Sequence, residues 1–144
     1  MEAPRYFEDI PVGEVVRTPG RTVTMADVIR FASISGDPAG LDWSGVPPGE
    51  AAAVPDTMIM AFTSGLGFRV STPQPLVLAF LVFDWRFLAR VRMGDTVYCQ
   101  SQVITKRALK EGGVLVEKRE ILNQRGEVVQ EGEYKLLVAR RPRA

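Results

Sequence analysis

The longest feature of the hydrophobic pattern is an uncharged, largely apolar stretch in the first half of the chain. Residues 57–68 carry no charged side chain, and their apolar residues fall on every face of a 3.6-residue helix. Such a helix is either buried or membrane-spanning, and a span needs about 20 apolar residues. Pro55 and Asp56 are residue types that favour a first helical turn. The pattern therefore predicts a helix within residues 54–70 that is buried on all sides.

A second helix is predicted earlier in the chain, over residues 24–35. Thr24 and Asp27 have the spacing of a capping box, and apolar residues then recur at i, i+3 and i+4 on one face. Gly36 is expected to end this helix. Residues 37–53 follow with six Gly or Pro residues, and a long irregular segment of this kind is usually functional or mobile.

The remaining segments have the alternation of β-strands. Residues 15–23 are predicted to be extended, with a break at Pro19-Gly20. Residues 76–83 form a continuous apolar run, which is typical of a strand covered on both faces and is expected to continue to residue 87. Short loops connect this strand to three further strands, at residues 96–107, 114–122 and 128–139, and the four strands together are predicted to form an antiparallel meander.

Composition narrows the chemistry that is available to the chain. The 18 basic and 17 acidic residues give a net charge of +1, so nothing favours a nucleic acid or an anionic membrane as partner. The absence of histidine excludes imidazole bases and ligands, and Cys99, the single cysteine, cannot build a thiolate zinc site. We therefore predict no metal site.

The lone Cys99 also fits a reducing compartment. Residues 1–13 contain acids and prolines where a signal peptide needs a basic and then an apolar segment. We predict a cytoplasmic protein with a single domain over residues 1–144. The fold class expected from these elements is α+β: the hotdog fold, an antiparallel sheet wrapped around a long central apolar helix. Because one sheet cannot cover such a helix completely, a homodimer or an oligomer of dimers is also expected.

Short motifs throughout the chain match a known family. The matching segments are YFEDIPVG at 6–13, TVT at 22–24, FA at 31–32, SGD at 35–37, VP at 54–55, DWRFLA at 84–89, VRMGDTV at 91–97 and LNQRGEVVQEGE at 122–133. Together these segments resemble the MaoC-like acyl-CoA dehydratases and (R)-specific enoyl-CoA hydratases. The resemblance covers nearly the whole chain, and no single motif carries it alone.

The resemblance implies that water is added to, or removed from, a 2-enoyl thioester. In the family motif G-D-x-N-P-x-H, the Asp and the His activate water, and backbone N–H groups at the start of the central helix hold the thioester oxygen. Asp37 matches the family Asp. Asp42 stands where an ungapped match places the His, and with a short gap the His has no counterpart. The family's acid–base partner is therefore missing.

Further site residues follow from the same match. Trp43 is expected to be a pocket wall or lid, and the start of the central helix, Pro55, Asp56, Thr57 and Met58, is expected to contact the substrate. The resemblance implies no cofactor beyond the coenzyme A of the substrate, and a CoA or acyl-carrier thioester as partner. We expect Asp37 to be buried against the apolar helix, with a raised pKa.

Structural explanations stand beside these roles. An Asp after a helix end often makes local backbone hydrogen bonds, which would suffice to explain Asp37. Asp42 can simply be solvated, Asp56 can be a helix-start acid, and Trp43 can anchor its loop. Three functions remain open: a hydratase-like lyase using Asp37, a hotdog thioesterase using a carboxylate, and a non-catalytic acyl-thioester-binding protein or degenerate subunit.

Overall fold

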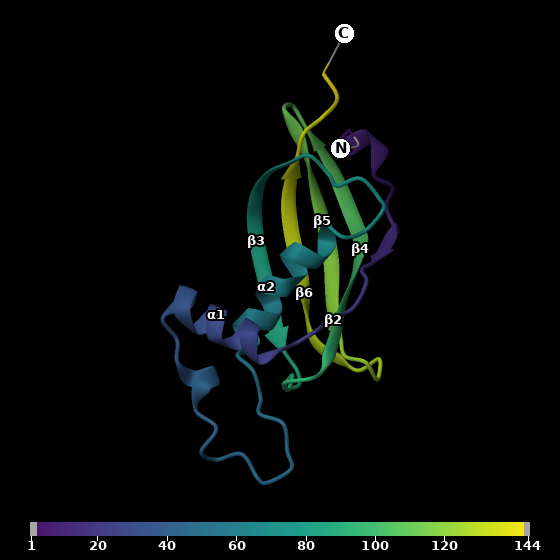
Figure 1. The fold of residues 1–144 in the computed structure, drawn as a ribbon. Helices are drawn as coiled ribbons and strands as arrows, with labels where there is room; N and C mark the ends of the chain where they lie inside the picture. The colour runs from purple at the N-terminus through teal and green to yellow at the C-terminus, as the bar shows by residue number, and fades with distance from the viewer. Residues whose placement is uncertain (1–2, 143–144) are drawn as a thin grey trace.

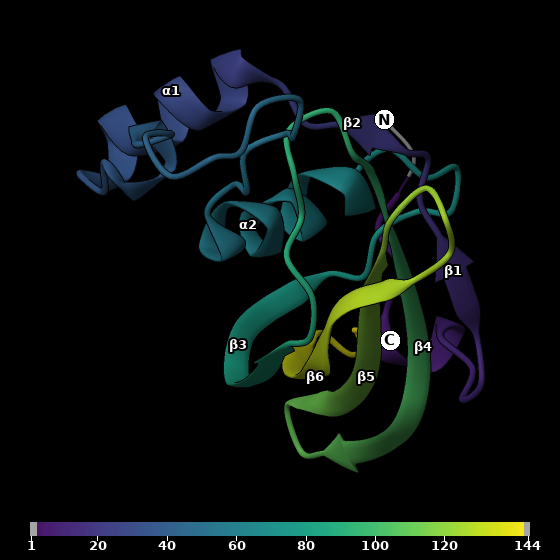
Figure 2. The ribbon, with the colours of Figure 1, turned by 90° about the horizontal axis from the view of Figure 1, so that it is seen from below.

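The computed structural model describes residues 3–142, in which a curved antiparallel sheet holds helix α2 against its concave face (Figures 1 and 2). Helix α1 and the segment that follows it lie to one side of this layered unit (Figure 1). The elements are η1 (Phe7–Asp9), β1 (Val15–Arg17), β2 (Arg21–Thr22), α1 (Met25–Ser35), η2 (Ala39–Leu41), α2 (Asp56–Gly67), β3 (Val77–Phe87), β4 (Thr96–Leu109), β5 (Gly112–Leu122) and β6 (Val128–Val138).

The sheet order is β1–β4–β5–β6–β3, with β2 paired to β4. Strands β4, β5 and β6 form the predicted meander, with hairpins at the predicted loops. The expectation that β3 takes part in this meander is wrong, because β3 pairs with β6 and not with the next strand along the chain. The chain after β3 instead crosses the end of the sheet to begin β4, which leaves β3 at a sheet edge.

Helix α2 is shorter and more one-sided than its sequence indicates. It has 12 residues, and its buried side chains are Met58, Ile59, Thr63 and Leu66. Ala61, Ser64 and Gly65 lie on an exposed face. The predictions of a long helix and of burial on all sides are therefore wrong for the single chain. Small residues account for the exposed face, since they show the solvent little apolar surface.

Strand β3 is more exposed than its sequence predicts. Its apolar run is not covered on both faces: Leu78, Phe80, Leu81 and Val82 are 55%, 64%, 48% and 45% exposed. Strands β4 and β5 show the expected inward alternation more clearly. The apolarity of β3 therefore reflects a strand that lacks a neighbour on one side within this chain.

Two apolar clusters fill the space between the helices and the sheet. The first joins the start of α2 to α1 and to one end of the sheet; its buried members are Val23, Val28, Val54, Met58, Ile59, Val91, Val97, Ile121 and Val129. The second lies at the other end, beneath η1; its buried members are Phe7, Ile10, Val103, Leu115, Tyr134, Leu136 and Val138. Trp85 packs against both clusters.

Helix α1 begins and ends as its sequence predicts. Thr24 and Asp27 form a reciprocal capping box, and Gly36 ends the helix with a φ of 73°, in the left-handed region that suits glycine. Arg21 forms an ion pair with Asp27, and its guanidinium carbon lies 3.9 Å from the Phe62 ring centroid on α2. No helix among residues 3–142 is long and apolar enough to cross a membrane.

Asp27 should make the stability of the protein depend on pH. Burial of Asp27 opposes ionisation, but hydrogen bonds from Thr24 and the charge of Arg21 outweigh it and lower the pKa. A carboxyl whose pKa is lower in the folded state stabilises the fold above its unfolded pKa of about 4, and this contribution disappears as the pH falls through the folded pKa. We expect Asp27→Asn to cost about 1 kcal/mol of unfolding free energy at pH 7.

Urea denaturation at pH 7 and below pH 4 measures this effect. The difference between the wild type and Asp27→Asn should shrink as the pH falls. Glu133→Gln is the matched control, because Glu133 is exposed on β6 and has no hydrogen-bond partner among residues 3–142. A destabilisation by Asp27→Asn that is the same at both pH values would contradict the prediction.

Candidate functional site

The irregular segment after α1 packs on the first turn of α2. Gly40 in η2 is buried, and a Cβ placed on it would lie 2.8 Å from Cγ and Cδ of Pro55 and 3.0 Å from Cγ1 of Val28. Only a residue without a side chain permits this approach. The tertiary structure therefore brings the segment that carries Asp37 and Asp42 to the start of α2. The resemblance to the MaoC-like family implies the same proximity.

Asp37 adopts a local turn at the entrance to this segment. Its Oδ1 accepts a hydrogen bond from the Ala39 N–H at 2.9 Å, and its own N–H donates to Ser35 Oγ at 3.1 Å. The side chain is exposed. The expectation that Asp37 is buried against the apolar helix is therefore wrong for the single chain, since α2 turns its apolar face to the sheet and not to this turn.

Asp42 and Trp43 are held within the same segment. Asp42 Oδ1 accepts hydrogen bonds from the Ser44 hydroxyl at 2.7 Å and from the Ser44 N–H at 3.0 Å, and these bonds lower the pKa of Asp42. Trp43 is half-exposed and donates its indole N–H to the Gly40 carbonyl at 2.8 Å. The bond to Gly40 makes Trp43 an anchor of its loop.

The first turn of α2 presents unpaired backbone donors. The N–H groups of Met58 and Ile59 bond the Pro55 carbonyl at 3.1 and 3.4 Å, whereas those of Asp56 and Thr57 have no partner among residues 3–142. Asp56 Oδ1 is buried and also lacks a partner there. The helix start thus combines free N–H donors with one free carboxylate oxygen, next to the Asp37 segment.

The buried amide of Gln130 positions this helix start. Gln130 on β6 is fully buried; its Nε2 donates to the Asp56 carbonyl at 2.9 Å, and its Oε1 accepts from the Trp85 indole N–H at 2.9 Å. One side chain therefore connects β6, β3 and α2. The only sequence signal for this role was a polar residue among the alternating positions of the last strand.

A cavity of about 410 Å³ lies beneath the second half of α2. Thr63, Ser64 and Gly67 form its helical wall, and Pro73 and Pro75 belong to the connection that closes it. Inward-facing residues of β4 and β5 form the sheet side: Cys99, Ser101, Val103, Glu117 and Arg119. This cavity was not predicted from the sequence, although two charged residues at alternating positions of one strand were a visible signal.

The part of the cavity wall formed by β5 carries an ion pair. Arg119 donates to Glu117 Oε2 from Nε at 3.1 Å and from Nη2 at 2.9 Å. The guanidinium carbon of Arg119 lies 4.2 Å from the Tyr134 ring centroid, and Tyr134 Oη lies 3.1 Å from Thr63 Oγ1. Burial raises the pKa of Tyr134, so the phenol stays protonated and available as a donor. On β5, Glu117 and Arg119 thus lie between Leu115 of one apolar cluster and Ile121 of the other.

Cys99 is buried beside these residues, at an inward position of β4. Burial raises the pKa of its thiol to about 11, so the reactive thiolate is scarce near neutral pH.

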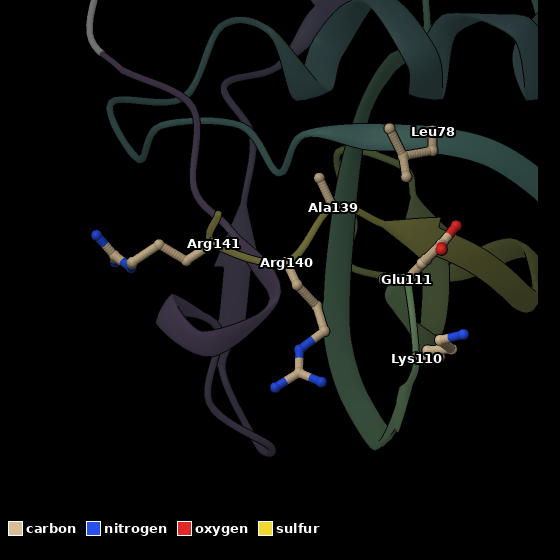
Figure 3. A pocket seen from close by; sticks show the side chains of 7 residues that line it. Leu78, Lys110, Glu111, Ala139, Arg140 and Arg141 are labelled. Carbon is tan, nitrogen blue, oxygen red and sulfur yellow. The ribbon is translucent and has the colours of Figure 1, made fainter. Parts of the chain in front are cut away.

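A second hollow, of about 360 Å³, lies at the β4–β5 hairpin (Figure 3). Arg140 and Arg141 point in different directions from its rim (Figure 3). Arg140 donates to Glu8 and Arg141 pairs with Asp9, so both cations tie the end of the sheet to η1. These contacts give the two arginines a structural role.

No protein-family model matches the chain. Protein MaoC of Klebsiella aerogenes is 30% identical over 97 residues, which are 65% of this chain and 29% of MaoC. The chain thus spans less than a third of the length of the curated relative that it matches.

Solved structures match over nearly the whole chain. The monoamine oxidase regulatory protein of Archaeoglobus fulgius has a TM-score of 0.83 and 29% identity, covering 96% of this chain and 97% of its own. A MaoC-like dehydratase of Rhodospirillum rubrum has a TM-score of 0.78 and 25% identity, covering 96% and 99%. A double-hotdog protein of Mycobacterium tuberculosis has a TM-score of 0.85 and 19% identity, covering 98% and 46%, which confirms the hotdog fold.

Gln130→Met tests the role of the buried amide. The substitution keeps the side-chain length but leaves the Trp85 indole N–H without its acceptor, and an unsatisfied buried donor costs about 1–3 kcal/mol. We expect the free energy of unfolding in urea to fall by that amount. Gln102→Met is the control, because Gln102 is exposed on β4. Equal stability of the two variants would show that the amide does not hold the helix start.

Proposed function

The chain belongs to the MaoC-like dehydratase family of hotdog proteins, and from that membership we propose that it binds an acyl thioester at the start of α2. The observation that carries the proposal is the pair of unpaired N–H groups of Asp56 and Thr57, beside the segment that holds Asp37. Two N–H donors at a helix start suit a thioester oxygen, and they favour the negative charge that develops on it during reaction.

The neighbouring polar groups complete this binding proposal. Asp56 Oδ1 is buried without a donor, so it accepts a hydrogen bond from a substrate only if the side chain turns outward. The bound molecule is a CoA or acyl-carrier thioester, and its acyl chain runs along α2 toward the 410 Å³ cavity. Trp43, held at the outer side of the Asp37 segment, would border the entrance.

We propose addition or removal of water at a 2-enoyl thioester as the reaction. Asp37 takes a proton from water as the water oxygen bonds the β-carbon, while the α2 N–H groups hold the thioester oxygen. The protonated Asp37 then gives this proton to the α-carbon, which completes the addition of water and restores the carboxylate. Asp37 Oδ2 is free for this role, because the described hydrogen bond engages Oδ1. Asp42 assists as the second carboxylate of the segment.

A second candidate function is binding without turnover. It is favoured by the local turn of Asp37, whose exposed carboxylate accepts from Ala39, and by the absence of histidine. An exposed carboxylate without an acid–base partner has no second group to help it abstract a proton from water. In this case the chain retains the binding groups at α2 and is a non-catalytic acyl-thioester-binding protein or a degenerate subunit paired with an active one.

We also propose a homodimer, through strand β3. This strand is at the sheet edge and exposes Phe80, Leu81 and Val82. An edge strand offers unpaired backbone groups, and a long apolar edge needs a cover. A second β3, related by a two-fold axis, satisfies both needs at once and covers the exposed face of α2.

Asp37→Asn separates the two functional candidates. The substitution keeps the size of the side chain and removes its basicity, and the exposure of Asp37 protects the fold. We expect the variant to lose crotonyl-CoA hydration, followed by absorbance of the enoyl thioester. Thermal stabilisation by acyl-CoA should remain, at about 2.7 kcal/mol when the ligand is present at 100 times its Kd. Glu50→Gln, exposed in the same segment, is the control and should retain activity.

The outcomes of this experiment decide between specific alternatives. Equal turnover by the wild type and Asp37→Asn would remove Asp37 from the reaction. A wild type that binds acyl-CoA but never turns over crotonyl-CoA would establish the second candidate. A melting temperature that no acyl-CoA or enoyl-CoA shifts at millimolar concentration would contradict thioester binding itself.

Leu81→Lys tests the dimer. A charge placed at the centre of the β3 edge should give a particle with the chain mass of 15.9 kDa in light scattering, whereas the wild type should have twice that mass. Ile104→Lys, a comparable exposed apolar site on β4, should leave the dimer intact. A monomeric wild type at micromolar concentration would rule out the proposed assembly.

A further inference from the structure

The cavity beneath α2 contains an ion pair where an apolar surface would suffice for an acyl chain. The Glu117 and Arg119 side chains are 9% and 18% exposed. They are two residues apart on the inward face of β5, and Ser101 of β4 lies opposite Arg119 in the strand register. Desolvating two charges is costly, and packed apolar residues of similar volume are often at least as stable. The pair therefore points to a role in recognition.

The pair has hydrogen-bonding capacity that is not used within residues 3–142. Both bonds from Arg119 end on Glu117 Oε2, so Glu117 Oε1 is left without a partner there. The Ser101 hydroxyl, which also lines the cavity, has no hydrogen bond among the same residues. Neither oxygen is sealed from solvent, because Asp56 Oδ1 is the only fully buried side-chain oxygen without a partner among residues 3–142. A ligand group that donates to Glu117 and accepts from Ser101 or Arg119 can therefore reach both residues and supply the missing partners.

The charged residues that line the cavity are paired, which favours a ligand group without a net charge. Glu117 is matched by Arg119, and Glu14 is matched by Arg5 through two hydrogen bonds of 2.7 and 2.8 Å. No net charge remains among these four lining residues to attract a carboxylate or an amine. A hydroxyl is neutral and can donate and accept at the same time, so it meets both requirements.

We propose that this cavity selects acyl groups that carry a hydroxyl toward the end remote from the thioester. The inference rests on the proposed function, because it places the thioester at the start of α2. Thr63 and Ser64 lie seven and eight residues beyond Asp56, which is about 10–12 Å along a helix. The remote end of a medium-length acyl chain can therefore reach Glu117 and Arg119.

Calorimetric titration of the full chain with octanoyl-CoA and its ω-hydroxy analogue tests the selection. We expect the wild type to bind the hydroxylated ligand about tenfold more tightly, since its hydroxyl gains a hydrogen bond to a charged group that the methyl end of octanoyl-CoA cannot make. The double variant Glu117→Leu/Arg119→Met should lose or invert this preference while still binding octanoyl-CoA. Removing both charges together avoids leaving one of them buried alone.

The outer face of the same strand supplies a matched control. Lys118 and Glu120 form an ion pair of 2.6 Å on β5, directed away from the cavity. The double variant Lys118→Met/Glu120→Leu should retain the wild-type preference. Thermal unfolding of all three proteins checks the fold, and the wild-type comparison of the two ligands stands even if the inner variant does not fold.

The outcomes are distinct. Equal affinity of the wild type for both ligands, or tighter binding of octanoyl-CoA, would overturn the selection while leaving the proposed function in place. A preference that survives in the Glu117→Leu/Arg119→Met variant would also overturn it. Failure of the wild type to bind either CoA ester would refute the proposed function, and the selection with it.

Discussion

The position of α2 depends on one buried amide. Gln130 accepts from Trp85 and donates to the carbonyl of Asp56, so β3, β6 and the helix start are related through a single side chain. Its amide needs both partners, because burial removes water as an alternative. The apolar residues of α2 favour packing on the concave face of the sheet but do not by themselves set its position. The hydrogen bond from Gln130 to the Asp56 carbonyl sets the position of the first turn, and therefore of its free N–H groups.

A pair of charged residues on β5 interrupts the apolar interior of this fold. Glu117 and Arg119 lie between Leu115, which belongs to one apolar cluster, and Ile121, which belongs to the other, and both line the cavity. Thioester binding and tail selection, as proposed, use the two ends of one helix: its backbone donors at Asp56 and the charged pair beneath Thr63.

The exposed apolar face of β3 is the complement of this interior. Within one chain, β3 closes the sheet on one side only, and Phe80 and Leu81 remain exposed although their sequence reads as a core strand. A strand that its own chain buries and a strand that a partner buries have the same apolar sequence pattern, so the pattern does not show which of the two covers β3. The same ambiguity applies to α2, whose exposed face carries small residues that suit a close neighbour.

The sequence by itself determined the elements and much of the fold. The capping residues Thr24 and Asp27, the end at Gly36 and the hairpin loops are local features, so they can be recognised without knowing what packs around them. The match of Asp37 to a family motif was equally local. The tertiary structure alone decided that β3 pairs with β6, that Asp37 is exposed, and that Glu117 and Arg119 face a cavity. Those facts depend on which distant segments meet, and pairing of distant segments is governed by packing and burial that a one-dimensional pattern does not contain.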